Sequence, residues 1–110
     1  MTQPRDRTVA APAVLLTIAR LSALAVEGVA GMAAVPGGVN RLFKRGVGDG
    51  VQIEVDDNSI RAKLYLVVSA AADIQAVARA VQAEVGRAYQ DMVGMEMRGV
   101  IVSIQDVDYD

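Results

Sequence analysis

Three carboxylates close together near the middle of the chain are the side chains best placed to do chemistry. Glu54, Asp56 and Asp57 lie at a predicted turn. Paired carboxylates can serve as general acid and general base when their surroundings move their pKa values apart. A turn is usually wet, however, and water keeps carboxylate pKa values ordinary. The position therefore favours a charged hairpin tip over a catalytic pair.

Other reactive patterns are weaker. The chain has no Cys and no His, which removes thiol nucleophiles, thiolate metal sites, imidazole bases and the Ser-His-Asp triad. Asp106, Asp108 and Asp110 alternate in the manner of calcium ligands, but no loop glycine or glutamate accompanies them. The glycines from Gly46 to Gly50 lead into a predicted strand and lack the Walker pattern. We expect no enzyme activity, no cofactor and no metal.

Length, charge and composition restrict the classes of partner that the protein can bind. A chain of 110 residues forms one domain. The formal charge of −2, the pI near 5.0 and a low aromatic content argue against nucleic acid. The longest apolar stretch, Ala10 to Ala19, ends at Arg20, well short of the ~20 residues that a membrane span needs. Arg20 also lies where a signal peptide would not place a charge.

The segment that contains these carboxylates is predicted to form a β-hairpin. Val51–Asp56 and Ile60–Val68 each alternate between apolar and polar residues, as strands with one buried face do. A two-residue turn at Asp57-Asn58 puts the apolar partners on one face and the charged partners on the other. The predicted pairs are Val55 with Ile60, Ile53 with Ala62, Val51 with Leu64, Glu54 with Arg61, and Gln52 with Lys63.

The helix predicted to start at Pro12 is apolar around most of its circumference. Its expected core face comprises Val14, Leu15, Ile18, Leu21, Leu24, Ala25 and Gly28. The remaining apolar residues include Leu16, Ala19 and Ala23, and we expect them to face a second subunit or a partner. An alternative is that the Gly-rich segment folds back over them.

The C-terminal part predicts a helix and a strand. Asp73 is placed to cap the helix and Gly94 to end it. Its expected core face comprises Ile74, Val77, Ala78, Val81, Val85, Ala88 and Met92. The strand from Met95 to Val107 turns Val100, Val102 and Ile104 inward, and Ile101, Ser103 and Gln105 outward. A bulge at Arg98-Gly99 brings Met97 into phase with Val100.

These elements predict an α/β (α+β two-layer) domain, in the order helix, strand, strand, helix, strand. The sheet is three-stranded and mixed, and both helices cover one face. A right-handed crossover sets the last strand parallel to the middle one; a competing order sets it beside the first. The other sheet face then presents Tyr65, Val67 and Ile101 among polar residues, which suits association.

The same sequence patterns predict the boundaries of the domain. Residues 1–7 form a disordered lead-in, residues 8–107 a single domain with a Gly-rich connector over 36–50, and residues 108–110 an acidic tail. A short edge strand over Thr8–Ala11 and a helical turn over Val39–Phe43 are further expectations.

Several segments together resemble the alkaline shock protein family of bacterial envelope-stress-response proteins. They are AAPAVLLTIARLSALAVEGVAGM, GVQIEVDDNSIRAKLYLVV, ADIQAVARAVQAEVGRAYQDMVGM and VIVSIQDV. Specific marks are Glu27-Gly28-Val29, Gly50-Val51, Val81-Gln82 with Val85, and Gly94. In place of the family's frequent tyrosine-glycine pair after the second strand, this chain has Ser69-Ala70. The resemblance implies a non-enzymatic cytoplasmic protein that self-associates and is held at the inner face of the membrane by an integral partner, supporting envelope homeostasis.

The sequence thus predicts an interaction or scaffold protein, a homo-oligomer with a membrane-anchoring protein partner. Its expected surface comprises Tyr65, Val67, Ile101, Leu16, Ala19 and Ala23. The alternatives are a small enzyme using Glu54, Asp56 and Asp57, or an RNA-binding α/β module.

Overall fold

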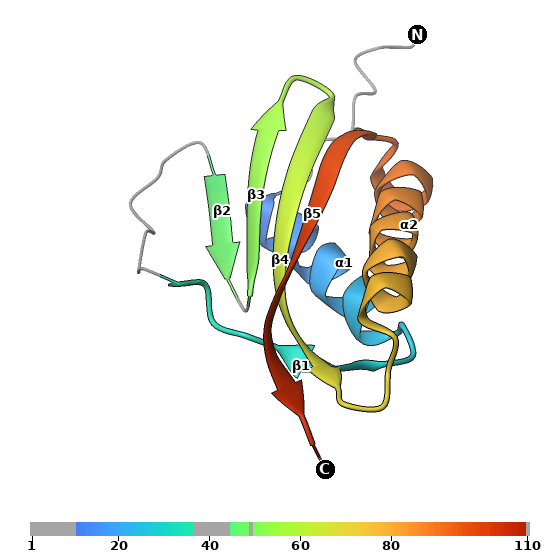
Figure 1. The fold of residues 1–110 in the computed structure, drawn as a ribbon. Coiled ribbons are helices and arrows are strands. Elements are labelled where there is room, and N and C mark those ends of the chain that lie inside the picture. Colours follow the sequence, from blue (N-terminus) through green and yellow to red (C-terminus); the bar gives the residue numbers. More distant parts are fainter. Residues whose placement is uncertain (1–10, 37–44, 49, 110) are drawn as a thin grey trace, which may run out of the picture.

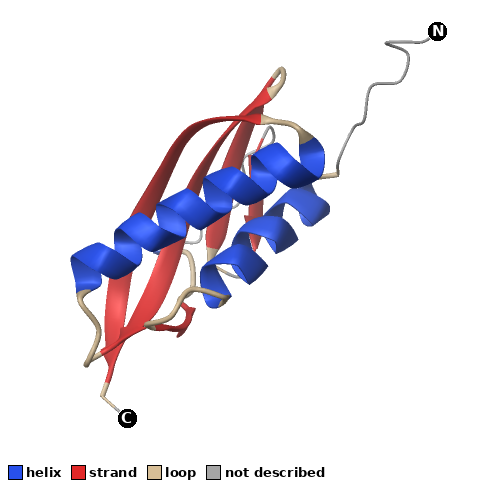
Figure 2. Ribbon diagram, turned by 90° about the vertical axis from the view of Figure 1, so that its right-hand side faces the viewer, coloured by secondary structure: helices blue, strands red, loops and turns tan. Residues whose placement is uncertain are grey.

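The computed structural model describes residues 11–36, 45–48 and 50–109. One sheet carries both helices on the same face, so the two-layer α+β class predicted from the sequence is confirmed (Figures 1 and 2). In the described part of the chain the sheet has five strands, where the sequence predicted three. The elements are α1 (Pro12–Leu24), β1 (Val29–Met32), β2 (Arg45–Gly48), β3 (Val51–Asp56), β4 (Ser59–Ser69), α2 (Ile74–Val93) and β5 (Glu96–Asp108).

The β3–β4 hairpin has the predicted register. Val55 pairs with Ile60, and the four other predicted pairs are also present. Asp57, in the two-residue turn, has φ 57°, the left-handed conformation that a tight hairpin requires and that Asp tolerates better than most residues. The inward residues Val51, Ile53, Ile60, Ala62 and Leu64 lie in the core, whereas Val55, next to the hairpin turn, is 36% exposed.

Strand β4 is the centre of the sheet. β3 pairs antiparallel on one side of it, and β5 pairs parallel on the other, so the predicted strand order is confirmed and the competing order is wrong. The predicted bulge is also confirmed, because Ile60 pairs with Met97 and Arg61 with Gly99. A second bulge at Gln105 was not predicted.

Strands β1 and β2 were missed, because the sequence predicted only a connector here. β1 pairs with β4 between Leu66 and Val68, along the same edge as β3, and β2 pairs with β3. Along this edge of β4, the pairing with β3 ends and the pairing with β1 begins near Gly50. Gly50 has φ 81°, and a Cβ atom at this position would lie 2.5 Å from the Ala33 carbonyl oxygen. Both strands have only four residues and contain glycine, so neither shows clear alternation. The expectations for residues 1–7, 8–10 and 39–43 lie outside the described residues.

Helix α1 begins at Pro12 as predicted, but its buried face differs from the prediction. Leu15, Ala19 and Ala23 are buried. Four residues of the predicted core face are exposed instead: Val14 (47%), Leu21 (54%), Leu24 (39%) and Ala25. The physical reason is close packing, since alanines let α1 lie close to its neighbours where leucines would hold it away.

Helix α2 follows its sequence signals. The Asp73 carboxylate accepts hydrogen bonds from the Gln75 and Ala76 N–H groups, and Gly94 ends the helix with φ 66°. Val77, Val81, Val85 and Ala88 are buried as predicted. Ile74 and Met92, at the two ends, are exposed and were wrongly assigned to the core.

Candidate interaction surface

Because both helices lie on one side, no described element covers the other face of the sheet (Figure 2). Strand alternation places on this uncovered face the side chains of Gln52, Glu54, Arg61, Lys63, Tyr65, Val67, Ile101 and Ser103. Ile101 is 55% exposed, although a large apolar residue is more often buried. Polar and charged side chains surround it.

Tyr65 lies on the uncovered face but presents little surface. It is only 7% exposed, and its hydroxyl donates to Gln52 Oε1 at 2.9 Å. Lys63 Nζ lies 5.3 Å from the ring centroid, within the range of a cation–π contact. Val67 is half-buried. The predicted apolar patch is therefore narrower than expected, because neighbouring side chains pack over the tyrosine.

The expectation that Ala19 and Ala23 leave apolar surface uncovered is wrong, since both are fully buried, and Leu16 is half-buried. The excess apolar surface that the sequence indicated on this helix does exist, but Val14, Leu21 and Leu24 provide it. Their spacings of seven and three residues place them on one helix face, which points away from the core. We call Val14, Leu21 and Leu24 the outward stripe of α1.

Sequence reasoning assigned Val14, Leu21 and Leu24 to the core because apolar residues surround most of α1, and their periodicity indicated the wrong side. Thr17 lies on the same face, between Val14 and Leu21, and is the polar residue that could have marked it. Its hydroxyl donates to the Ala13 carbonyl at 2.9 Å, so its hydrogen-bonding need is met within the helix. A single threonine of this kind is a weak signal of exposure.

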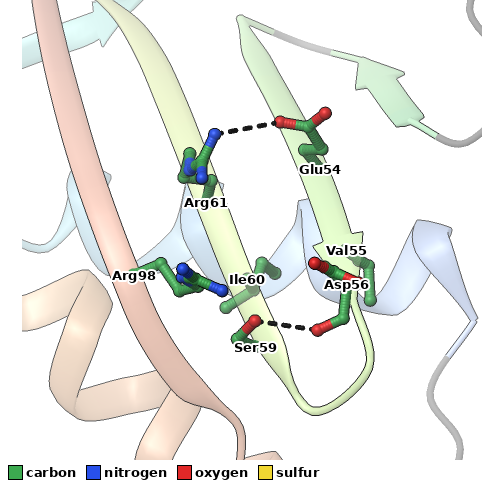
Figure 3. Close-up of a pocket in the computed structure, with 7 residues that line it drawn as sticks. All are labelled: Glu54, Val55, Asp56, Ser59, Ile60, Arg61 and Arg98. Atoms are coloured by element: carbon green, nitrogen blue, oxygen red, sulfur yellow. Dashed lines mark hydrogen bonds and ion pairs between the residues drawn. The ribbon is translucent and has the colours of Figure 1, made fainter.

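Two of the three predicted carboxylates, Glu54 and Asp56, line a hollow of about 230 Å³ at the hairpin tip (Figure 3). Its lining residues are Glu54, Val55, Asp56, Ser59, Ile60, Arg61 and Arg98. Arg61 Nη1 lies 3.5 Å from Glu54 Oε1, and the Ser59 hydroxyl donates to the Asp56 backbone carbonyl at 2.8 Å. Two arginines thus accompany two carboxylates, while Asp57 is not part of the lining.

This hollow does not have the character of an acid–base site. Glu54 and Asp56 are both exposed, whereas a general acid or base usually works where water is excluded. Among the described residues, no group of three or more carboxylates could hold a metal ion. The arrangement supports a solvated charge network at the tip of the hairpin.

Membrane insertion has no helical candidate in the described part of the chain, where neither helix combines the length and the hydropathy needed to cross a bilayer.

A model of the alkaline shock protein 23 family, described as having a cell envelope-related function, matches residues 1–109. The chain belongs to this alkaline shock protein family. The resemblance seen in the sequence is thereby confirmed. Among curated proteins, this family member is 30% identical over 102 residues to the uncharacterized protein YqhY of Bacillus subtilis, covering 91% of the chain and 76% of YqhY.

This alkaline shock family member also resembles solved structures of MamM CTD variants. One matches with a TM-score of 0.58 at 15% identity, covering 86% of this chain and 93% of the other. The zinc form of another variant matches with a TM-score of 0.59 at 15% identity, covering 88% and 87%. At this identity the likeness shows a shared fold.

Proposed function

We propose that this alkaline shock family protein is a non-enzymatic interaction protein that self-associates to support the cell envelope under stress. One observation carries the proposal: Ile101, on the edge strand β5, is 55% exposed on a sheet face that no described element covers. Solvent contact with such a side chain costs free energy, which association recovers.

The surroundings of Ile101 suit a protein interface. The Arg61–Glu54 ion pair and the Lys63–Tyr65 contact form a polar border on the β4 side of Ile101. A second hollow of about 190 Å³ lies beside Ile101, lined by it and by Gln52, Ile53, Glu54, Arg61, Ala62 and Lys63. An apolar centre with a charged rim is the usual anatomy of an interface between folded proteins.

We assign the outward stripe of α1 to an integral membrane protein that holds the chain at the cytoplasmic face of the membrane. Val14, Leu21 and Leu24 offer three apolar side chains on one helix face, the pattern that binds an apolar groove or another helix. The stripe lies on the helical layer and leaves the uncovered sheet face available for self-association.

Sedimentation velocity or light scattering on the purified chain tests self-association. Wild-type protein should associate at high micromolar concentration, and Ile101→Glu should shift it toward monomer because the charge would be buried in the contact. Tyr65→Glu is a poorer probe, since Tyr65 is packed within its own chain. Met92→Glu, on exposed α2 surface, is the matched control and should leave the association unchanged. A wild-type chain that stays monomeric under these conditions contradicts the proposal.

Capture from detergent-solubilised membranes tests recruitment. Wild-type protein should retain an integral membrane protein, identified by mass spectrometry, and Leu21→Glu should release it while Met92→Glu does not. Equal retention by the Leu21 variant would exclude the outward stripe as the contact.

A further inference from the structure

Strand β5 is a long edge strand with one unused side. It extends over 13 residues, from Glu96 to Asp108, and pairs with β4. No strand among the described residues pairs with its other side (Figure 1). An edge of this length presents a row of backbone donors and acceptors to which another strand can bind.

The hydrogen bonds at its two ends show which residues face the unused side. The Glu96 N–H donates to the Asn58 carbonyl, and the Asp108 carbonyl accepts from the Ala70 N–H, so both residues face β4. Backbone groups alternate in direction along a strand, and each bulge adds one residue to the count. With bulges at Arg98 and Gln105, the residues that direct both N–H and C=O away from β4 in the intervening segment are Val100, Val102 and Ile104.

Side chains cap this edge near its ends and leave its middle open. Gln82 Nε2 donates to the Val100 carbonyl at 3.1 Å, which confirms that this carbonyl faces away from β4. Asp106 Oδ1 accepts from the Val107 N–H at 2.8 Å. No described side chain bonds to the outward backbone groups of Val102 or Ile104. The stretch from Val100 to Ile104 carries no charge and is rich in β-branched residues, a composition that favours strand pairing.

We propose that two copies of the chain join edge to edge through β5, antiparallel, about a two-fold axis at Val102. The inference rests on the proposed self-association and specifies its geometry. In this register Val102 pairs with Val102 of the second copy, and Val100 pairs with Ile104 of the second copy. All three outward-facing residues of one copy thus meet outward-facing residues of the other, so the edge is complementary to itself. The Val100 carbonyl, which already accepts from Gln82, has a second lone pair for the Ile104 N–H of the second copy.

Charge also matches in this register. Arg98 of one copy comes near Asp106 of the other, at both ends of the paired segment. The bulges at Arg98 and Gln105 limit the regular pairing to the stretch between them. A two-fold contact uses the same edge of both chains, so it closes as a dimer and offers no further β5 edge for growth.

The same pairing accounts for the exposure of Ile101. It sets Ile101 opposite Ser103 of the second copy on the uncovered face, with the two isoleucines as diagonal neighbours about 7–8 Å apart. Each isoleucine covers part of the other. A peptide from an unrelated protein would match the backbone groups but would not supply this symmetric pairing of charges and isoleucines.

Val102→Pro tests the inference at the axis. The Val102 N–H faces away from β4, so proline preserves the β4–β5 pairing and removes the donor that the second copy needs. Val102→Ala retains the N–H and is the matched control. Sedimentation velocity across a concentration series should show a dimer for wild-type and Val102→Ala, and a dissociation constant at least about tenfold higher for Val102→Pro.

Amide hydrogen exchange on wild-type protein gives an independent readout that needs no variant. The Val102 and Ile104 amides should exchange rapidly in dilute protein and slowly in concentrated protein, while the Ile101 amide, which faces β4, should be protected in both. Association without concentration-dependent protection at Val102 and Ile104 would overturn the edge-to-edge dimer and leave self-association standing. A wild-type chain that remains monomeric would overturn both.

Discussion

The two helices of this protein differ in what determines which of their faces is buried. α2 carries a capping carboxylate at Asp73 and a left-handed glycine at Gly94, and its polar residues mark the solvent side. α1 has no side-chain cap at Ala11, and its apolar residues extend nearly all the way round. Local signals therefore identify the buried face of α2, while the buried face of α1 depends on which residues fit against its neighbours.

Small buried side chains and one long-range hydrogen bond hold α1 against its neighbours. Ala19 and Ala23 are fully buried, and the Tyr89 hydroxyl of α2 donates to the Leu15 carbonyl of α1 at 2.7 Å. The comparison teaches that an apolar helix can bury its smallest residues and expose its largest ones when close approach is the stronger requirement.

The strongest test of this comparison is a charge on each side of α1. Ala19→Asp should lower the free energy of unfolding by about 3–5 kcal/mol, because it places a carboxylate where no described partner can compensate it. Leu21→Asp, on the outward stripe, should cost less than about 1 kcal/mol. Urea denaturation measures both. Equal losses would mean that the helix is not oriented as described.

Tyr89→Phe tests the contact between the helices. Loss of the hydrogen bond to Leu15 should lower the free energy of unfolding by about 1 kcal/mol at neutral pH. Burial raises the pKa of Tyr89, so the unfolded state releases this proton first, near its ordinary value of 10.0. The wild type should therefore keep its full stability below about pH 10, and this group should then cost up to about 1.4 kcal/mol per pH unit above it.

The phenylalanine variant should lack that alkaline contribution. Denaturation between about pH 8 and 11, on either side of the ordinary tyrosine pKa, measures the difference. Tyr109→Phe is the exposed control. Parallel pH profiles for wild type and Tyr89→Phe would contradict a buried, neutral hydroxyl.

The smallest effects concern the helix starts. Asp73→Ala should lower the free energy of unfolding by about 1 kcal/mol or less, because it leaves two N–H groups of α2 without their acceptor. Ala11→Asp should raise it by a similar or smaller amount, since Ala11 already has the extended backbone of a capping residue. Thermal unfolding of the two variants should shift in opposite directions; a shift in the same direction would show that the two helix starts do not differ in this way.

Much of the fold was predictable because its signals are local. The hairpin register follows from alternation together with a two-residue turn, and any slip would reverse one strand. The bulge at Arg98 follows from two apolar residues that are out of phase, and both ends of α2 follow from single residues. In contrast, β1 forms because it can pair with an edge of β4, and β2 forms because it can pair with an edge of β3. The four residues of each short strand do not by themselves indicate this pairing.

The candidate surface likewise has one part that the sequence predicted and another part that only the structure revealed. Ile101 was predicted from alternation and is exposed, but Tyr65 is covered by Gln52 and Lys63, neighbours from the same sheet face. The outward stripe of α1 required the structure, since the sequence pattern assigned its three residues to the core.

By itself, the sequence determined the hairpin, the capped helix, the parallel last strand and the family, because each depends on residues close together in the chain or on a pattern that recurs in relatives. Only the tertiary structure decided which side of α1 is buried, which outer-face side chains remain exposed and which backbone groups of β5 point away from β4. These outcomes depend on volumes and distances between segments far apart in the chain, and periodicity carries no information about either.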